Sequence, residues 1–305
     1  MKWEKKGLIY GPDGSSSWAK HSALQPTPLL KKDGIIRVFV GFRNEDGIGR
    51  VGYVDVLAEN PSVVLKVSPY PVLDIGLPGA FDDNGVIPCA IVERDEKLFL
   101  YYAGYQLLKT VRFKAFSGLA ISTDGGECFY RYQNVPILER THDEFLFRAL
   151  HSLIYEDGIW KVWYGAGSQF IHGKDKTLPV YNIRYMESKD GMVFPLSGKV
   201  CLDIQKEEYR VGRPFVIKKN GIYRMFFGFA TETIPYRLSY AESFDGINWE
   251  RKDNKMEMDY PKNAFDSDMS CYPSIVFYKS KTYMFYNGNN YGQQGFGYAE
   301  SEGEF

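Results

Sequence analysis

Two pairs of carboxylates occupy matching places along this chain. Asp83 and Asp268 each lie five residues before a proline that opens an apolar run, and Asp82 and Asp266 stand near them. Two carboxylates facing one pocket can serve as general acid and general base, the pairing that cleavage of an acetal bond needs. We take Asp82, Asp83 and Asp268 as candidate catalytic residues. The competing interpretation is that both clusters are hydrogen-bonded or solvated turns before strands.

A second set of residues is polar or basic and suited to holding an anion or a sugar. Arginine binds phosphate or carboxylate through two parallel hydrogen bonds, and histidine titrates near neutral pH. The candidate substrate-binding residues are His21, Gln25, Arg43, Arg148, His151, Arg210, Arg213, Glu232, Asp266 and Asn290. Arg210 and Arg213 have the alternative of pairing with Glu207 and Glu208 at the surface, and His151 that of a hydrogen-bonded core histidine.

These residues belong to a sequence that repeats. Five apolar runs end in a glycine, and successive glycines are 63, 61, 63 and 60 residues apart. The glycines are Gly41, Gly104, Gly165, Gly228 and Gly288. A fixed period indicates one supersecondary unit per repeat, packed against its neighbours.

Each repeat reads as a set of antiparallel strands. A strand near a proline or histidine leads through a tight turn to the strand that ends in the glycine, and a third strand follows. Phe129, Phe194 and Trp249 are expected to open a fourth, outer strand. The fifth repeat shows only three strands, and the segment 2–10 is expected to supply its fourth, which would cover an open sheet edge.

The expected fold is all-β: a five-bladed β-propeller with four antiparallel strands per blade. Residues 1–305 form a single domain in this interpretation. The expected blades are residues 20–70, 80–135, 145–200, 208–255 and 264–305, the last completed by 2–10. Two β-sandwiches side by side are the alternative, but they give no reason for equal intervals.

Composition narrows the possible functions. The net charge is −1, which gives no overall field to attract nucleic acid, and the 16% of aromatic residues suffices for a core and for stacking on sugars. No apolar stretch is long enough to span a membrane and the first residues lack a signal-peptide core, so we expect a cytoplasmic protein without a membrane partner. Cys89, Cys128, Cys201 and Cys271 are expected to be buried free thiols. No spacing is specific enough to indicate a metal, and no cofactor is expected.

The hairpin geometry predicts where a site would lie. The start of a blade's first strand and the end of its second strand share one edge, and the first strand is innermost. The polar candidates lie at these positions, and we therefore expect them to ring one funnel. Phe81, Tyr105, Phe170, Tyr236 and Tyr291 are rim aromatics suited to stacking on sugar rings.

The whole chain resembles the five-bladed propeller superfamily of glycoside hydrolase families 43, 32, 68 and 130, which includes arabinanases, invertases, levansucrases and mannoside phosphorylases. The resemblance rests on the aromatic-glycine strand endings, the segment Gly79-Ala80-Phe81-Asp82-Asp83-Asn84-Gly85-Val86-Ile87-Pro88, and the run from Ser239 to Trp249. It implies the propeller fold and chemistry at an anomeric centre.

The departures from that resemblance are informative. Family 43 members carry Asp-Pro in blade one and Glu-Gly-Pro in blade four, where this chain has Gln25-Pro26 and Gly212-Arg213-Pro214. The latter is closer to family 130, whose members bind phosphate with basic residues. Further cations, Arg112, Lys114, His172, Lys174 and Lys176, lie on rim loops.

The sequence therefore predicts a carbohydrate-active enzyme of the glycosyl hydrolase type. Its partner is a carbohydrate, sugar phosphate or nucleotide sugar that carries an anionic group, and hydrolysis, phosphorolysis and glycosyl transfer all stay open. A catalytically inactive carbohydrate-binding propeller is the alternative. A protein-interaction propeller comes third, because it would favour an apolar funnel.

Overall fold

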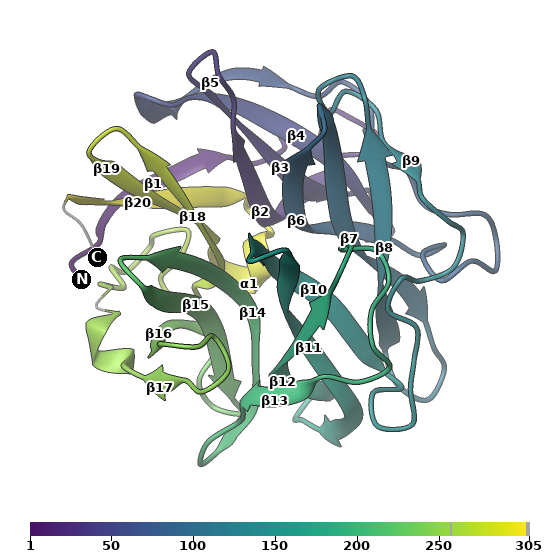
Figure 1. The fold of residues 1–305 in the computed structure, drawn as a ribbon. Coiled ribbons are helices and arrows are strands. Elements are labelled where there is room, and N and C mark those ends of the chain that lie inside the picture. Colours follow the sequence, from purple (N-terminus) through teal and green to yellow (C-terminus); the bar gives the residue numbers. More distant parts are fainter. Residues whose placement is uncertain (257, 303–305) are drawn as a thin grey trace.

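The computed structural model describes residues 1–256 and 258–302, and it is built of β-strands throughout (Figure 1). Helical segments within those residues are short: the 3-10 turn η1 (Asp253–Lys255) and helix α1 (Asn289–Gly292). The all-β class expected from the sequence is confirmed. None of the described helices has the length and apolar character needed to cross a membrane.

The strands follow one another in antiparallel groups arranged around a common centre (Figure 1). The first group is β2 (His21–Leu30), β3 (Ile35–Arg43), β4 (Gly49–Leu57) and β5 (Asn60–Val67); the second is β6 (Val86–Arg94), β7 (Lys97–Leu107), β8 (Phe113–Ser122) and β9 (Tyr130–Arg131). The third is β10 (Phe147–Glu156), β11 (Ile159–His172), β12 (Thr177–Ser188) and β13 (Lys199–Leu202); the fourth is β14 (Glu208–Lys219), β15 (Ile222–Thr231), β16 (Arg237–Ser243) and β17 (Glu250–Arg251). The last is β18 (Cys271–Tyr278), β19 (Lys281–Asn287) and β20 (Phe296–Glu302), with β1 (Glu4–Tyr10) at its edge.

The N-terminal strand completes the last group, as the sequence predicted. β1 pairs antiparallel with β20, from Glu4 opposite Glu300 to Tyr10 opposite Phe296. Both ends of the described chain therefore lie in one sheet, and β1 covers the edge that β20 would otherwise expose.

The groups are not all separate sheets. One-residue or two-residue parallel pairings join β8 to β10, through Phe147 and Arg148, and β12 to β14, through Arg210. The second, third and fourth groups consequently form one continuous sheet. In both places the third strand of one group pairs with the innermost strand of the next group.

The outer strands differ in length, and β9 and β17 have only two residues each. Phe129 and Trp249 directly precede the two-residue strands β9 and β17, in agreement with the sequence. Phe194 does not open a strand, because β13 begins only at Lys199. The thiols also differ in part: Cys89 and Cys271 are buried and free, whereas Cys128 and Cys201 are free but half-buried.

The hydrophobic core lies between neighbouring groups rather than within one of them. One cluster joins Phe39 and Tyr53 of the first group to Tyr102 and Phe116 of the second. Equivalent clusters join each later pair of groups, and another packs the last group against the first. Side-chain packing thus holds the first and last groups together, although no strand pairing connects them.

A buried carboxylate fastens the loop before the innermost strand in three groups. In each case a tyrosine 20 residues later donates its hydroxyl to the carboxylate, and the pairs are Asp82 with Tyr102, Glu144 with Tyr164 and Asp266 with Tyr286. Each carboxylate also meets a cation. We call these three arrangements the loop staples.

The cations of two loop staples come from outermost strands. Arg131 of β9 lies 2.8 Å from Asp82, and Lys5 of β1 lies 2.6 Å from Asp266. Lys5 therefore occupies in the last group the place that Arg131 occupies in the second. The N-terminal strand contributes a charge to its sheet as well as backbone hydrogen bonds.

Lys5→Ala should destabilise the protein strongly. Asp266 is 1% exposed and would lose the cation beside it, and removing one member of a buried ion pair costs about 3–5 kcal/mol. Lys6→Ala is the matched control, since Lys6 pairs with the exposed Glu4 and should change stability by no more than about 0.5 kcal/mol. Denaturant unfolding measures both, and equal effects would contradict the assignment of Lys5 to a loop staple.

Candidate functional site

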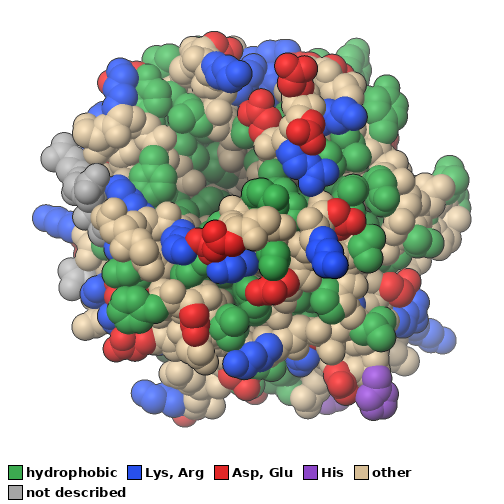
Figure 2. Space-filling model, in the orientation of Figure 1, with side chains coloured by type: hydrophobic (Ala, Val, Ile, Leu, Met, Phe, Trp, Pro, Cys, Tyr) green, Lys and Arg blue, Asp and Glu red, His purple; other side chains and the backbone are tan. Residues whose placement is uncertain are grey.

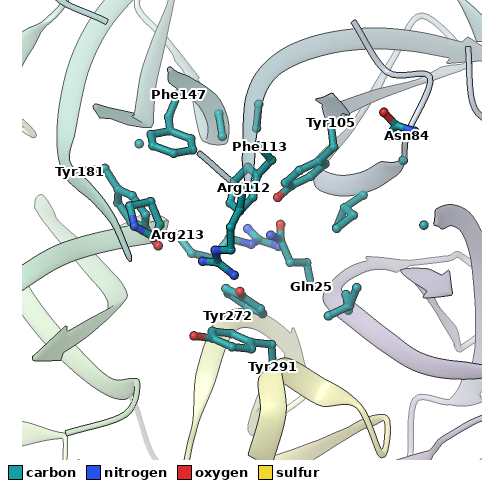
Figure 3. A pocket seen from close by; sticks show the side chains of 18 of the residues that line it. Gln25, Asn84, Tyr105, Arg112, Phe113, Phe147, Tyr181, Arg213, Tyr272 and Tyr291 are labelled. Carbon is teal, nitrogen blue, oxygen red and sulfur yellow. The ribbon is translucent and has the colours of Figure 1, made fainter. Parts of the chain in front are cut away.

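The innermost strands surround a cavity of about 380 Å³. Figure 3 shows Gln25, Tyr105, Arg213 and Tyr272 pointing toward it from different groups. Its polar lining consists of Gln25, Arg43, Asn84, Tyr105, Arg112, His151, Tyr181, Arg210, Arg213, Tyr236, Tyr272 and Tyr291. This size suits a small ligand, and the mixture of aromatic rings with a few cations is typical of such sites.

Every innermost strand carries one extra residue at the same level, and in four of the five strands a residue within this bulge lines the cavity. The shifts fall between Leu24 and Thr27, Pro88 and Ala90, Leu150 and Ser152, Gly212 and Phe215, and Cys271 and Ser274. A bulge bends its strand and turns a residue out of the regular alternation. Gln25, His151, Arg213 and Tyr272 all stand inside these bulges and all line the cavity.

Three of these bulge residues have a left-handed backbone. Gln25, Arg213 and Tyr272 have φ of 52°, 55° and 60°, and each precedes a proline. Residues other than glycine adopt this region at a cost, and such strain collects at functional positions. The sequence Xaa-Pro at the start of the innermost strand therefore marks a cavity-facing residue.

Arg213 is a buried cation without a carboxylate partner among the described residues. It is 2% exposed, and its Nη2 donates to Thr27 Oγ1 at 3.2 Å. Its Nε and Nη1 meet no hydrogen-bond acceptor. Burial lowers the pKa of this guanidinium from its ordinary value, yet arginine stays charged at neutral pH. Two of its donors are thus free to bind a ligand in the cavity.

Thr27 positions this arginine. Its hydroxyl donates to the carbonyl of Gln25 at 2.9 Å while accepting from Arg213. The backbone N–H of Gln25 in turn donates to Asn287 Oδ1 at 2.7 Å, and Asn287 is fully buried in the last group. A chain of hydrogen bonds therefore runs from the junction of the first and last groups to Arg213.

Arg210 is the second buried arginine of the cavity. Its guanidinium lies 4.0 Å from the ring centre of Tyr236, and its Nη2 donates to the hydroxyl of Tyr291 at 2.9 Å. Its Nε has no hydrogen-bond partner. Like Arg213, it lacks an ion pair with any described carboxylate. Both arginines therefore enter the pocket and do not pair with Glu207 or Glu208, the alternative considered from the sequence.

Two further arginines lie nearer the opening. Arg43 ends β3 and has a buried Nε without a partner, and Arg112 donates from its Nε to the carbonyl of Thr177 at 2.9 Å. In the space-filling view, acidic and basic side chains are interspersed around a hollow near the middle of the face (Figure 2). Inside the cavity the charge has one sign, since no aspartate or glutamate of the described residues lines it.

His151 is a neutral member of the cavity wall. Burial lowers its pKa well below the ordinary value, and the nearby charge of Arg213 acts in the same direction. Its Nδ1 is buried without a hydrogen-bond partner. A neutral imidazole offers one donor and one acceptor, so His151 is placed to contact a ligand hydroxyl or anion.

The structure brings together five of the candidate binding residues. They are Gln25, Arg43, His151, Arg210 and Arg213. The others lie outside the lining. Arg148 pairs with Glu144 at 2.5 Å, Asp266 belongs to a loop staple, and His21 contacts Ser22. Glu232 and Asn290 are exposed.

The candidate catalytic carboxylates also lie outside the lining. Asp82 is fully buried between Arg131 and Tyr102, and Asp268 is exposed, with its backbone carbonyl bonded to Arg237. Asp83 accepts the amide of Gly79 through Oδ2, while its Oδ1 is buried and unpaired. The matching positions of Asp82 and Asp266 therefore correspond to loop staples.

Some residues of the cavity lining were not predicted from the sequence. Tyr272 had a signal, since it precedes a proline as Gln25 and Arg213 do. Tyr181 had none, because it reaches the cavity through the long hairpin of β11 and β12. Of the predicted rim aromatics, Tyr105, Tyr236 and Tyr291 line the cavity, whereas Phe81 stacks on Tyr102 and Phe170 packs on Phe113 and Phe147. Within the residues described, no group of histidine, cysteine and carboxylate side chains could hold a metal.

The chain was compared with family models, with curated sequences and with solved structures. No family model matches the chain. It is 31% identical over 303 residues to the uncharacterized protein Rv1502 of Mycobacterium tuberculosis H37Rv, covering 99% of this chain and 100% of that protein.

Two solved structures have a similar fold at low sequence identity. One is described as belonging to the GH130 family of mannoside phosphorylases, which contains glycoside hydrolases that target β-1,2-mannosidic linkages in Candida mannan; its TM-score is 0.73 at 12% identity, over 99% of this chain and 94% of that one. The other is β-1,2-mannobiose phosphorylase from Listeria innocua with β-1,2-mannobiose, at a TM-score of 0.69, 11% identity and 96% of both chains. The likeness establishes a shared fold.

His151→Gln should weaken the acid sensitivity of folding. A histidine whose pKa is lowered in the folded state contributes stability above its unfolded pKa, near 6.5, and loses it as the pH falls below that value. At pH 5.5 the native protein should therefore lose about 1.4 kcal/mol that the variant does not lose. His142→Gln is the control, because His142 is almost fully exposed. Parallel stability curves for the wild type and His151→Gln between pH 8 and 5.5 would refute a neutral His151.

Proposed function

We propose that this chain, which belongs to the same family as the uncharacterized protein Rv1502 of Mycobacterium tuberculosis, binds a carbohydrate with an anionic group in its central cavity. The ligand class is a sugar that carries phosphate or carboxylate. The strand groups are, in this proposal, the five blades of one propeller domain spanning residues 1–305.

The observation that carries the proposal is the uncompensated charge of Arg213 and Arg210. A buried charge without a partner is costly, and it persists where a ligand supplies the opposite charge. The free Nε–H and Nη1–H groups of Arg213 point to different sides of the guanidinium, and each can donate to an oxygen of a phosphate or carboxylate. The surrounding tyrosines add ring faces for a sugar and hydroxyls for its polar groups.

The absence of a described carboxylate from the lining favours binding over ordinary hydrolysis. Hydrolysis at an anomeric centre uses two carboxylates that flank the bond, and neither Asp82 nor Asp268 reaches the cavity lining. The geometry therefore supports binding of an anionic sugar better than it supports hydrolysis. This corresponds to the binding propeller considered as the alternative from the sequence.

Catalysis is the second candidate, and one observation favours it. Asp83 Oδ1 is buried without a hydrogen-bond partner, and the next residue, Asn84, lines the cavity. Phosphorolysis needs a single protein acid, because a bound phosphate oxygen attacks the anomeric carbon while the acid protonates the departing oxygen. Asp83 would be that acid and the arginines would hold the phosphate. The shared fold with a mannobiose phosphorylase agrees with this second candidate.

Arg213→Gln should weaken binding of anionic sugars roughly 10- to 100-fold, the value of one charge-assisted hydrogen-bonded contact. Calorimetric titration of mannose 1-phosphate, mannose 6-phosphate and glucuronate against neutral mannobiose and arabinan measures it. Arg140→Gln removes an exposed arginine outside the lining and should leave the affinities unchanged. Binding of neutral arabinan without any binding of the charged sugars would overturn the proposal.

Asp83→Asn and Asp268→Asn separate catalysis from binding. If the protein turns over a glycoside, loss of the acid should reduce kcat by about 10²-fold or more, while the exposed Asp268 should change it less than about twofold. Release of reducing sugar, measured with and without inorganic phosphate, gives the rates. Turnover unaffected by Asp83→Asn would remove Asp83 from the mechanism, and the binding proposal would stand.

A further inference from the structure

Two hairpin tips beside the cavity opening carry a cluster of cations. The β7–β8 tip contains Lys109, Arg112 and Lys114, and the β11–β12 tip contains Lys174 and Lys176. The only acidic residue in segments 107–114 and 170–177 is Asp175, so the two tips together carry a charge of +4 (five cations less one anion). The whole chain has a net charge of −1, so the concentration of positive charge is local.

The two tips form one surface. Arg112 donates its Nε–H to the carbonyl of Thr177 at 2.9 Å, and the rings of Phe113 and Phe170 meet at 5.9 Å. Short turns close both tips: the backbone N–H of Leu108 donates to the carbonyl of Arg112, and that of Gly173 donates to the carbonyl of Lys176. Because the tips are fastened side by side, their cations lie on one continuous surface. We call residues 107–114 and 170–177 the basic tips.

The cations of the basic tips are not neutralised by the protein. Many other lysines of the described chain pair with carboxylates, among them Lys5, Lys66, Lys161, Lys218, Lys252 and Lys279. Within residues 1–256 and 258–302, none of the five cations of the basic tips has an ion pair within 4.0 Å. Lys109 and Lys174 are exposed. A group of unpaired cations at one place attracts anions.

The basic tips are continuous with the cavity. Leu107 and Arg112 belong both to the tip of β7–β8 and to the cavity lining. Lys176 lies 5.9 Å from the ring centre of Tyr291, which also lines the cavity. A ligand whose anionic end sits at Arg213 and whose chain leaves the opening on this side would therefore run along the basic tips.

We propose that the basic tips are an outer subsite for an acidic oligosaccharide, whose terminal anionic sugar enters the cavity and whose next charged sugars contact the tips. This inference rests on the proposed function and extends it from a single charged sugar to a chain with repeated anionic groups. The terminal unit is recognised by Arg213 and Arg210, and chain length is recognised by Lys109, Lys174 and their neighbours.

The test compares galacturonate with α-1,4-linked tetragalacturonate by calorimetric titration. The tetrasaccharide should bind at least about tenfold more tightly than the monosaccharide, and this increment should fall as ionic strength rises. The double variant Lys109→Ala, Lys174→Ala should lose roughly three- to tenfold in affinity for the tetrasaccharide, the value of two exposed charge contacts, with galacturonate binding unchanged. Arg213→Gln should weaken both ligands.

The double variant Lys97→Ala, Lys189→Ala is the matched control, since it removes two exposed lysines from the strand turns at the opposite edge of the groups. Equal affinities for the two sugars, no binding of the tetrasaccharide, or an unchanged affinity in the Lys109, Lys174 variant overturns the outer subsite. Binding of the basic tips to phosphatidylglycerol vesicles in place of the tetrasaccharide overturns it as well. Retained binding of mannose phosphates through Arg213 in any of these cases leaves the proposed function standing.

Discussion

The buried guanidinium of Arg213 is the constraint around which the centre of this protein is arranged. It is held 2% exposed with one hydrogen bond to Thr27 and without a carboxylate within the described chain. Desolvating a cation in this way costs free energy that only the rest of the fold can supply. The packing between consecutive strand groups, including that of the last against the first, supplies it. The same burial keeps His151 neutral and leaves donor groups directed into a cavity of about 380 Å³.

The acidic residues illustrate how a repeat can be misread. The matching positions of Asp82 and Asp266 were correctly interpreted as equivalent, but in the structure their equivalence lies in the loop staples, together with Glu144. A carboxylate buried between a tyrosine hydroxyl and a cation fixes a loop in place. The carboxylate recurs in three groups because each of these groups has a loop before its innermost strand that must be held in place. The cavity, in contrast, differs at each position, with glutamine, histidine, arginine and tyrosine at the bulges.

The sequence predicted the strand pattern and the role of the N-terminal segment because both depend on local signals. Apolar alternation, turn residues and the recurring glycines locate β2, β3 and their equivalents, and the missing outer strand of the last repeat indicates a donor such as β1. Gln25, Arg43, His151, Arg210 and Arg213 were found because hairpin geometry puts strand starts and ends at one edge. Tyr181 was not found, since a long hairpin brings it to the cavity, and neither was Thr27, which acts through its hydrogen bond to Arg213. No local pattern encodes such distant contacts, and the direction of Asp82 depends on Arg131, a residue 49 positions away.

The extra residue in each innermost strand has a consequence for how this fold can change. On a regular strand, side chains alternate between the two faces, and a residue that faces a ligand lies beside residues of the same face that pack in the core. Exchanging it therefore disturbs the packing of that face. A residue held in a bulge stands outside that alternation. The positions of Gln25, His151, Arg213 and Tyr272 can therefore diverge in chemical type while the clusters between the strand groups stay constant. The bulges thus separate the side chains that meet the cavity from the side chains that pack the core.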